Sequence, residues 1–285
     1  MSQLNSLVAI IAIVSLLAAC QIRPSAAPDV QDNNNVEPAK EGEQKNVDML
    51  DSGKNADDYV FAEDVVYYDG TTGYIARPNV DGTFPAVVMI HEWWGLNDNI
   101  KDMARQLAAE GYVVLAVDLY DGQVATDAAK AGELVSAVRQ NPEPALKNLK
   151  AAVAYLRSQE DVIPEKVASL GWCFGGGMSL QLALTGTPLA ATIIYYGSLE
   201  TNATKLAAIK QPVLGIFGGK DTSIPLASVM EFNSTLGQIG TPRDIYVYPE
   251  VGHAFANPSG ANYAPDETKD AWDKTLSFLE KNLKQ

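Results

Sequence analysis

The sequence predicts an α/β fold, in which helices cover both faces of a mostly parallel central sheet. Continuous apolar runs, among them 85–91 and 112–120, alternate along the chain with stretches whose apolar residues follow helical spacing. Uninterrupted apolar runs are typical of strands buried on both faces, and their alternation with helices favours parallel pairing. No internal repeat and no second core is visible, so we predict one folded domain over residues 57–285.

The composition limits the classes of partner. The chain has 285 residues, of which 47% are hydrophobic, and this is enough for one sizeable core. It carries 21 Lys and Arg against 35 Asp and Glu, which gives a formal net charge of −14. Such a charge repels phosphate backbones, so we exclude nucleic acid and expect a small-molecule partner. We favour a monomer.

The N-terminus predicts an export signal, residues 1–19. The apolar run from Leu7 to Ala19 is too short for a comfortable bilayer span of about 20 residues, but it suits the apolar part of a signal peptide. Its ending LAAC, residues 17–20, resembles the lipobox of prokaryotic lipoproteins, which implies lipidation at Cys20. Because no Lys or Arg precedes the run, a weakly anchored, uncleaved segment is the alternative.

A polar, Asn-rich segment, 20–56, follows the signal. It is almost free of large apolar residues and cannot bury enough surface to offset its ordering entropy. We predict a flexible tether between a lipid anchor and the folded domain. The protein is then exported and anchored at the outer face of the cell membrane, or lies in the periplasm or outside the cell. The lipid anchor is its only expected contact with a membrane.

The first elements of the domain are a hairpin and two strand–helix pairs. EDVVYY (63–68) and TGYIARP (72–78) flank the turn dipeptide Asp69-Gly70, which predicts an antiparallel hairpin. A strand over 85–91 and a helix over 97–111 come next, followed by a strand over 112–120 and a helix over 126–139. Asn141 and Pro142 predict the cap and first turn of a further helix, 143–159.

The second half of the domain repeats the alternation. Strands are predicted at 166–172, 190–197, 212–219 and 244–249, and helices from near Gly175 to 186, over 226–237 and over 268–281. Right-handed crossovers bring the carboxyl ends of parallel strands to one edge of the sheet. Open α/β sheets place their functional sites at that edge.

Cys173 lies in the tight connection between the strand 166–172 and the next helix. The pattern Gly171-x-Cys173-x-Gly175 is that of a nucleophile elbow with Cys in place of the usual Ser. The turn strains the backbone at the nucleophile, so the residues two before and two after it must be small. It also projects the sulfur above the sheet edge, beside a helix N-terminus that favours a thiolate. The alternative is a buried cysteine that acts as a small hydrophobic residue.

Two further groups follow strands in the order that accompanies such an elbow. Asp221 comes after the strand 212–219, and His253 comes after the strand 244–249. The chain order is therefore nucleophile, acid, histidine, and each residue is delivered to the same rim of the sheet. The alternatives are a surface histidine and an aspartate that caps the helix near Leu226.

The stretch HEWWG, residues 91–95, follows the first long apolar strand. A nucleophile elbow takes its second oxyanion-hole amide from the loop after this strand. A metal site with His91 and Glu92 is not expected, because the sequence lacks a helical H-E-x-x-H arrangement and a further set of ligands. The alternatives are an exposed carboxylate for Glu92 and plain packing for Trp93 and Trp94.

Five motifs together resemble the dienelactone hydrolase family, a branch of the α/β-hydrolase fold. They are HEWWG (91–95), VDLYDGQ (117–123), GWCFGGG (171–177), GGKDTSIP (218–225) and PEVGHAF (249–255). The predicted element order fits this family from about Val60 to the C-terminus.

The resemblance implies a role for each residue at a matching position. Cys173 would be the nucleophile, His253 the general base and acid, and Asp221 the group that orients His253. Glu92 would be the modulating carboxylate, which engages the thiol when no substrate is bound. The oxyanion hole would consist of two backbone amides, those of Phe174 and Trp93. Neither a metal nor an organic cofactor is implied.

Two departures from the family concern the substrate. Dienelactone hydrolases proper hold the substrate carboxylate with two arginines, at positions that are Gly122 and Asn257 here. Without these charge-assisted contacts the main reason to expect a carboxylated lactone is lost. Aromatic side chains near the motifs favour an apolar or aromatic acyl group instead, although aromatics are also ordinary core residues. The expected substrate-binding residues are Trp94, Tyr120, Tyr196, Phe255 and Asn257.

The sequence thus favours a cysteine-dependent hydrolase that cleaves a small ester or lactone through a thioester acyl-enzyme, similar to the carboxymethylenebutenolidases. A thioesterase or peptidase on the same fold shares every triad residue and is one alternative. A ligand-binding protein with weak catalysis is the other, because one fold can host many functions.

Overall fold

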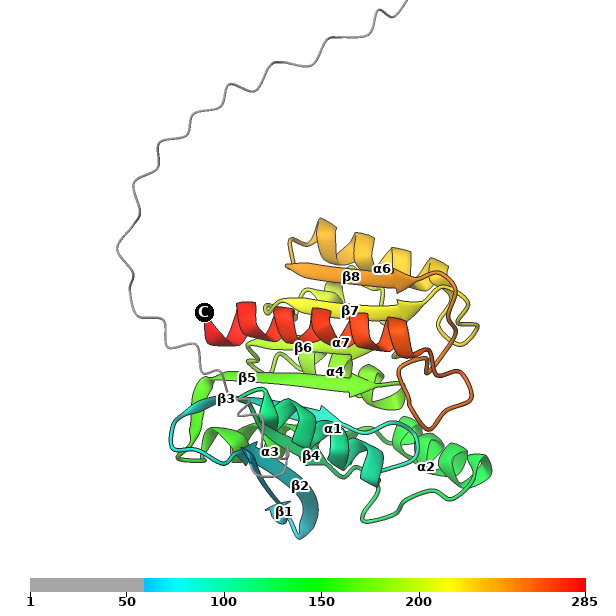
Figure 1. Ribbon diagram of the computed structural model, residues 1–285. Helices are drawn as coiled ribbons and strands as arrows, with labels where there is room; N and C mark the ends of the chain where they lie inside the picture. Colours follow the sequence, from blue (N-terminus) through cyan, green and yellow to red (C-terminus); the bar gives the residue numbers. More distant parts are fainter. Residues whose placement is uncertain (1–58) are drawn as a thin grey trace, which may run out of the picture. The chain divides into compact units, whose positions relative to one another are not determined.

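An eight-stranded sheet forms the centre of the fold, with strand order β1-β2-β4-β3-β5-β6-β7-β8 (Figure 1). The structure is a computed structural model that describes residues 59–285. Strands β3 to β8 are parallel to one another, while β1 pairs with β2 and β2 with β4 in antiparallel fashion. The predicted signal peptide, the lipidation site Cys20 and the tether 20–56 lie outside the described residues.

The elements follow the predicted alternation. The strands are β1 (Val60–Tyr68), β2 (Thr71–Pro78), β3 (Phe84–Ile90), β4 (Val113–Val117), β5 (Val162–Trp172), β6 (Ala191–Tyr195), β7 (Val213–Gly218) and β8 (Arg243–Tyr248). The helices are α1 (Asp98–Ala109), α2 (Ala128–Gln140), α3 (Glu143–Arg157), α4 (Phe174–Leu184), α5 (Ala203–Leu206), α6 (Leu226–Gln238) and α7 (Pro265–Leu279), and a π-helical turn (Glu280–Lys284) ends the chain.

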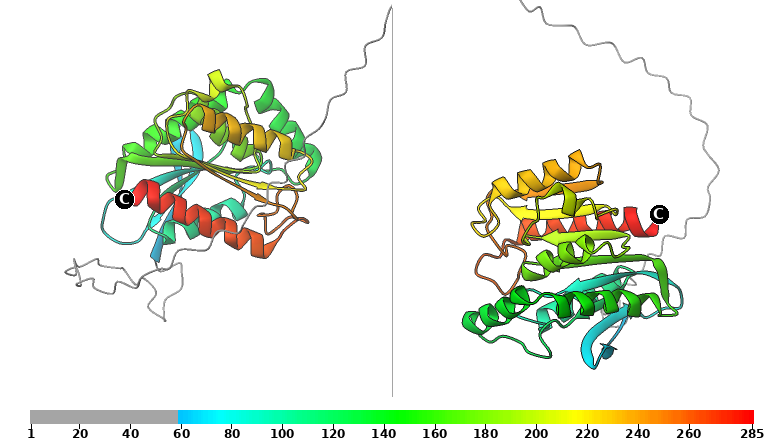
Figure 2. Two further views of the ribbon diagram at one scale, coloured as in Figure 1. Left: turned by 90° about the horizontal axis from the view of Figure 1, so that it is seen from above. Right: turned by 180° about the vertical axis from the view of Figure 1, so that it is seen from behind.

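Helices cover both faces of the sheet (Figure 2). Helices α1 and α7 pack on one face, where their apolar residues share a core with β3, β5, β6 and β7. Helices α2, α3, α4 and α6 pack on the other face over two further apolar clusters. Every residue of β4, β6 and β7 is buried, which explains why their sequences are continuous apolar runs. The predicted fold class is confirmed.

The hairpin β1–β2 turns at the predicted dipeptide. Asp69 and Gly70 have φ angles of 38° and 77°. Two consecutive positive φ angles are those of a type I′ turn, for which Asp-Gly is among the preferred dipeptides. The turn therefore selects the register of the strands that open the domain.

The strand predicted over 112–120 is too long at its end. Strand β4 ends at Val117 because Asp118 turns the chain. The Asp118 carboxylate accepts a hydrogen bond from the Tyr120 amide at 2.8 Å and another from the Gly122 amide. The short polar side chain of Asp118 thus binds backbone N–H groups in place of the hydrogen bonds that would continue the strand.

Two predictions about helices were incomplete. Pro142, and not Asn141, occupies the N-cap position of α3, and no side chain caps this end. The short helix α5 was not predicted, although Asn202 gives a local signal. Its side-chain oxygen accepts hydrogen bonds from the amides of Thr204 and Lys205, at 2.9 and 3.2 Å.

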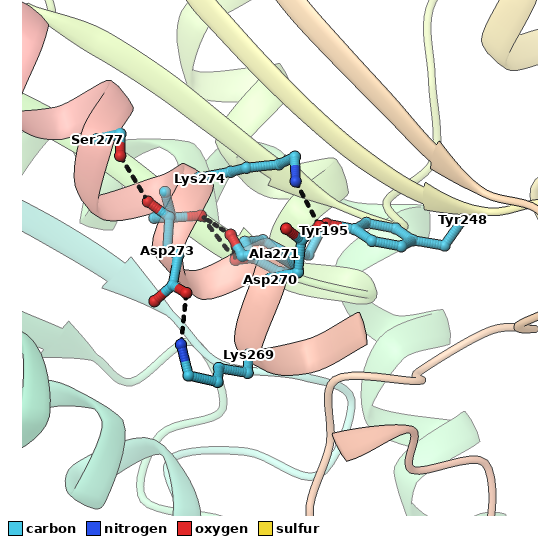
Figure 3. Close-up of polar contacts among 9 residues, drawn as sticks. Tyr195, Tyr248, Lys269, Asp270, Ala271, Asp273, Lys274 and Ser277 are labelled. Carbon is cyan, nitrogen blue, oxygen red and sulfur yellow. Dashed lines mark hydrogen bonds and ion pairs between the residues drawn. The ribbon is translucent and has the colours of Figure 1, made fainter. Parts of the chain in front are cut away.

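Tyrosines at the ends of β6 and β8 tie α7 to the sheet (Figure 3). The Tyr195 hydroxyl lies 3.0 Å from the Ala271 carbonyl oxygen and 2.6 Å from the Thr275 hydroxyl. The Tyr248 hydroxyl donates to Asp270 Oδ2 at 2.6 Å, and Lys274 pairs with the same carboxylate. These bonds fix α7 against the strands whose ends approach the candidate site.

Residues 59–285 belong to one compact unit. None of the helices in this part of the chain has both the length and the apolar character that crossing a bilayer requires. The carboxyl ends of β3, β5, β7 and β8 lie at one edge of the sheet, because these strands are parallel. The segments that follow them carry the candidate site.

Candidate active site

The connection from β5 to α4 holds Cys173 in a strained turn. Its φ of 54° and ψ of −116° are rare for a residue with a side chain. A Cβ atom on Gly171 would lie 2.2 Å from the Gly175 carbonyl oxygen, and one on Gly175 would lie 2.3 Å from the Ile90 carbonyl oxygen. Only glycine fits either position, as the elbow pattern predicts.

Cys173, His253 and Asp221 form a continuous line of contacts. His253 Nε2 lies 3.1 Å from Cys173 Sγ, and His253 Nδ1 lies 2.7 Å from Asp221 Oδ2. The carboxylate favours a proton on Nδ1, which leaves Nε2 as the acceptor that faces the thiol. The three residues predicted as a triad therefore lie within hydrogen-bond reach of one another, in the order that nucleophilic catalysis requires.

The loop after β7 holds Asp221 in place. Its Oδ1 atom accepts hydrogen bonds from the backbone amides of Ser223 at 2.7 Å and Ile224 at 3.0 Å. These bonds leave Oδ2 for His253, and the side chain is fully buried. Helix α6 has Pro225 at its N-cap position, so the alternative in which Asp221 caps this helix is wrong.

Glu92 follows β3 and is almost fully buried, with 5% of its surface exposed. Asn257 Nδ2 donates to Glu92 Oε2, and the Tyr196 hydroxyl donates to Oε1 at 3.3 Å. Burial raises the pKa of Glu92 to about 7, although both hydrogen bonds act to lower it. Because these two donors hold the carboxylate, the thiol contacts His253 and not Glu92. The arrangement differs from the thiol–glutamate contact that the family resemblance implied.

The surroundings of the Cys173 thiol favour its neutral form. Burial and, second, the charge of Glu92 raise its pKa to about 12. The backbone amides of Phe174 and Trp93 and the charge of Arg139 lower this pKa. The two amides predicted for the oxyanion hole are therefore directed at the sulfur, one from the N-terminus of α4 and one from the loop after β3.

His91 has no exposed surface and both its ring nitrogens are bonded to backbone. Nε2 accepts a hydrogen bond from the Leu119 amide at 3.2 Å, so Nδ1 carries the proton and donates to the Glu92 carbonyl oxygen at 2.5 Å. Burial lowers the pKa of His91, which keeps the ring neutral. His91 thus joins the loops after β3 and β4. Within residues 59–285, no group of three His, Cys, Asp or Glu side chains is arranged to hold a metal ion.

The model of the dienelactone hydrolase family matches residues 71–283 of this chain. The chain belongs to this family. As a dienelactone hydrolase family member, it is a hydrolase with the α/β-hydrolase fold that the motifs predicted.

Individual relatives of this hydrolase agree with the family assignment. "Putative carboxymethylenebutenolidase" of Saccharolobus solfataricus is 32% identical over 255 residues, which cover 76% of this chain and 98% of the relative. "Protein usf" of Aquifex pyrophilus is 33% identical over 217 residues, covering 74% of this chain and 93% of the relative. Among solved structures, a dienelactone hydrolase-like promiscuous phosphotriesterase from metagenomic libraries superposes with a TM-score of 0.73 at 26% identity, over 79% of this chain and 99% of its own.

A cavity of about 660 Å³ lies over Cys173 in this hydrolase. Its volume is that of a typical small-molecule site. Three of the predicted substrate-binding residues line it: Trp94, Tyr196 and Asn257. Asn257 has little hydrogen-bonding capacity left for a substrate, because its side-chain nitrogen donates to Glu92 and its side-chain oxygen accepts from the Ser259 amide at 2.9 Å.

Two predicted substrate-binding residues, Tyr120 and Phe255, do not line this cavity. Phe255 has no exposed surface and packs in the core against Tyr196 and Tyr248, with ring centroids 5.6 and 5.2 Å away. Tyr120 packs against His91 and Phe174 and lines a different cavity. Both aromatics support the walls of the site from behind, so these two predictions are wrong.

The sequence did not reveal four polar residues at the cavity: Arg139, Ser198, Ser223 and Asn262. All four are exposed, in contrast to the buried Glu92 and Asn257 on the same cavity. Arg139 lies in the last turn of α2, where a basic residue is expected to complement the helix dipole. No local pattern distinguishes such a residue from one that faces a site.

Proposed function

We propose that this protein is a cysteine-dependent hydrolase of small carboxylic esters or lactones, acting through a thioester acyl-enzyme on Cys173. The observation that carries the proposal is the unbroken contact chain from Asp221 through His253 to Cys173, at 2.7 and 3.1 Å. Cys173 and His253 line a cavity large enough for a small ester. The membership in a hydrolase family and the glycine-supported elbow agree with it.

Acylation begins from the neutral thiol. As Sγ attacks the ester carbonyl carbon, His253 Nε2 takes the thiol proton, and Asp221 stabilises the resulting imidazolium. The carbonyl oxygen becomes an oxyanion, which the backbone amides of Phe174 and Trp93 stabilise. Donors that are fixed before the charge develops contribute roughly 3 kcal/mol each in acyl transfer. When the intermediate collapses, the carbon–oxygen bond to the leaving group breaks and His253 protonates that oxygen.

Deacylation uses the same residues in the reverse order. Water enters beside the thioester, His253 Nε2 removes one of its protons, and the hydroxyl oxygen attacks the thioester carbonyl carbon. The carbon–sulfur bond then breaks, the sulfur recovers the proton from His253, and a carboxylic acid leaves. A lactone follows the same path, except that the leaving alcohol stays attached to the product.

The experiment compares wild type with Cys173→Ala on 4-nitrophenyl butyrate. The proposal expects a loss of at least about 10³-fold in kcat/KM for the variant, because the covalent path is removed. Thr185→Ala, a change at the far end of α4, serves as a control for handling and folding. Equal rates for wild type and Cys173→Ala would refute the proposal.

We also propose that the protein is exported and anchored through a lipid on Cys20, which follows from the sequence of residues 1–20. In this compartment the protein would meet substrates from outside the cytoplasm. Intact-mass measurement of the protein purified from membranes is expected to show a chain that begins at Cys20 and carries added acyl groups. A chain of unmodified mass that starts at Met1 would contradict the anchor.

A further inference from the structure

Arg139 is the one permanently charged cation on the cavity over Cys173 among residues 59–285. It extends from the end of α2 and is exposed, whereas Glu92 and Asn257 on the same cavity are 5% and 6% exposed. Arg139 therefore lies at the solvent side of the cavity. The inner wall holds the carboxylate of Glu92.

Arg139 also differs from the other arginines of the described part of the chain. Each of the others has a side-chain or carbonyl partner: Arg77 with Asp161, Arg105 with Asp102, Arg157 with Pro164, and Arg243 with Asn233. Arg139 has no hydrogen bond or ion pair within residues 59–285. In a chain of net charge −14, a guanidinium without an acidic partner is available to an anionic ligand.

Neither of the two positions at which the family resemblance implies a carboxylate-binding arginine carries a cation here. Gly122 has no side chain, and open space surrounds the point where its Cβ would be. Asn257 is neutral and uses its amide nitrogen to hold Glu92. A negative group deep in the cavity would meet the carboxylate of Glu92, which repels it once ionised.

We propose that Arg139 is a specificity-determining residue that binds a carboxylate at the far end of the acyl chain, so that half-esters of dicarboxylic acids are preferred substrates. The inference rests on the proposed function. A guanidinium matches a carboxylate in a bidentate pair, and one cation balances one negative charge. The carboxylate lies at the exposed mouth, while the ester carbonyl lies at Cys173 on the floor.

The electrostatics agree with this placement. The charge of Arg139 lowers the pKa of both the Cys173 thiol and the Tyr120 hydroxyl, although burial raises both overall. The charge of the guanidinium is therefore felt at Cys173, and both residues line the same cavity. One substrate can then engage Arg139 and Cys173 together.

The alternative is a purely structural role, in which Arg139 only complements the dipole at the end of α2. A structural role would affect the stability of the helix and would not distinguish between two esters. The ratio of kcat/KM for a charged and an uncharged ester of matched length separates these roles, because any general loss of activity cancels in the ratio.

The test uses the full chain with 4-nitrophenyl hydrogen adipate and 4-nitrophenyl hexanoate, at low and at 0.5 M sodium chloride. Arg139→Gln is expected to lower the adipate-to-hexanoate ratio by about tenfold, mainly through KM, since one charge-assisted contact is lost. Arg139→Lys should restore part of the ratio. Lys130→Gln is the matched control, because it removes the same charge from α2 at a side chain that pairs with Glu133 and lies off the cavity.

The outcomes keep the two proposals apart. A ratio that stays the same in Arg139→Gln, or falls equally in Lys130→Gln, would overturn the role of Arg139 while hexanoate turnover still supports the proposed function. A wild-type ratio that is insensitive to salt would also count against a charge contact at an exposed site. Loss of Cys173-dependent turnover of both esters would overturn the proposed function together with the inference.

Discussion

The two histidines of the chain lie at the same edge of the sheet and have opposite surroundings. His91 follows β3, has no exposed surface and uses both ring nitrogens on backbone groups. His253 follows β8, keeps 26% of its side chain exposed, and contacts Asp221 and Cys173. Residue type and position at a strand end are therefore insufficient to identify a catalytic base. What distinguishes His253 is a ring nitrogen that faces a nucleophile and a cavity.

The same contrast applies to the carboxylates beside them. Asp221 accepts hydrogen bonds from two backbone amides and contacts the His253 ring. Glu92 accepts hydrogen bonds from two neutral donors in a buried position, and burial raises its pKa to about 7. In the proposed mechanism Asp221 stabilises the imidazolium of His253, whereas the charge of Glu92 raises the pKa of the Cys173 thiol.

The largest effect is expected when each histidine is replaced separately by glutamine. His253→Gln should lower kcat/KM on 4-nitrophenyl butyrate by about 10⁴-fold with little change in the free energy of unfolding. His91→Gln should cost about 2 kcal/mol of unfolding free energy, since buried backbone groups lose partners, and reduce kcat/KM far less. Urea unfolding and steady-state kinetics on both variants measure this. The reverse pattern would show that the roles have been assigned to the wrong histidines.

Asp221→Asn tests how His253 is oriented. The side-chain oxygen of the variant can still accept hydrogen bonds from the amides of Ser223 and Ile224. Its NH₂ group, however, donates to His253 Nδ1 and so favours a proton on Nε2, which then cannot accept the proton of the thiol. We expect kcat to fall roughly 10³-fold while the midpoint of unfolding changes little. Asp244→Asn, on β8 and away from the cavity, is the control. An activity loss of under tenfold would mean that Asp221 does not set the tautomer.

Glu92→Gln should stabilise the protein in a pH-dependent way. Burial raises the pKa of Glu92 from 4.5 to about 7, so wild type loses stability as the pH rises through this window and the buried carboxyl must ionise. At about 1.4 kcal/mol per pKa unit, the variant gains on the order of 3 kcal/mol between pH 4.5 and pH 8 relative to wild type. Urea unfolding at both pH values measures the difference. A difference in unfolding free energy between variant and wild type that is the same at both pH values would show that Glu92 does not titrate in this range.

The smallest expected effect concerns the reactivity of the thiol. Because the charge of Glu92 raises the pKa of Cys173, Glu92→Gln should increase the rate of iodoacetamide labelling at pH 8 by up to about tenfold. Labelling is read on the peptide that contains Cys173, so that Cys20 does not contribute. Glu143→Gln, an exposed carboxylate at the start of α3, should leave the rate unchanged. A slower rate in Glu92→Gln would reverse the sign of the interaction.

Much of the fold could be predicted because its signals are local. Strands buried on both faces must be apolar throughout, and the elbow requires glycines at 171 and 175 because backbone atoms lie within 2.3 Å of where a Cβ would be. The order of the proposed triad could be predicted for the same reason, since each member lies in the segment that follows a strand. The end of β4 was misplaced because Asp118 looked like part of an apolar run and its side chain turns the chain.

The roles of several residues around the proposed triad could not be predicted, because these roles depend on contacts between distant segments. Asn257 and Tyr196 lie 165 and 104 residues from Glu92 in sequence, yet they hold its two oxygens. Phe255 sits two residues after His253 but points into the core, where it has no exposed surface. Arg139 reaches the cavity from a helix whose sequence gives no functional signal.

The most direct test of the catalytic claim is the identity of the covalent intermediate. The full chain is mixed with 4-nitrophenyl butyrate, quenched in acid during turnover, digested and measured by mass spectrometry. The proposed mechanism predicts one butyryl group on the peptide that contains Cys173, removable by neutral hydroxylamine and absent from Cys173→Ala. Continued turnover with no acyl group on Cys173, or an acyl group on another residue that persists in Cys173→Ala, would contradict it.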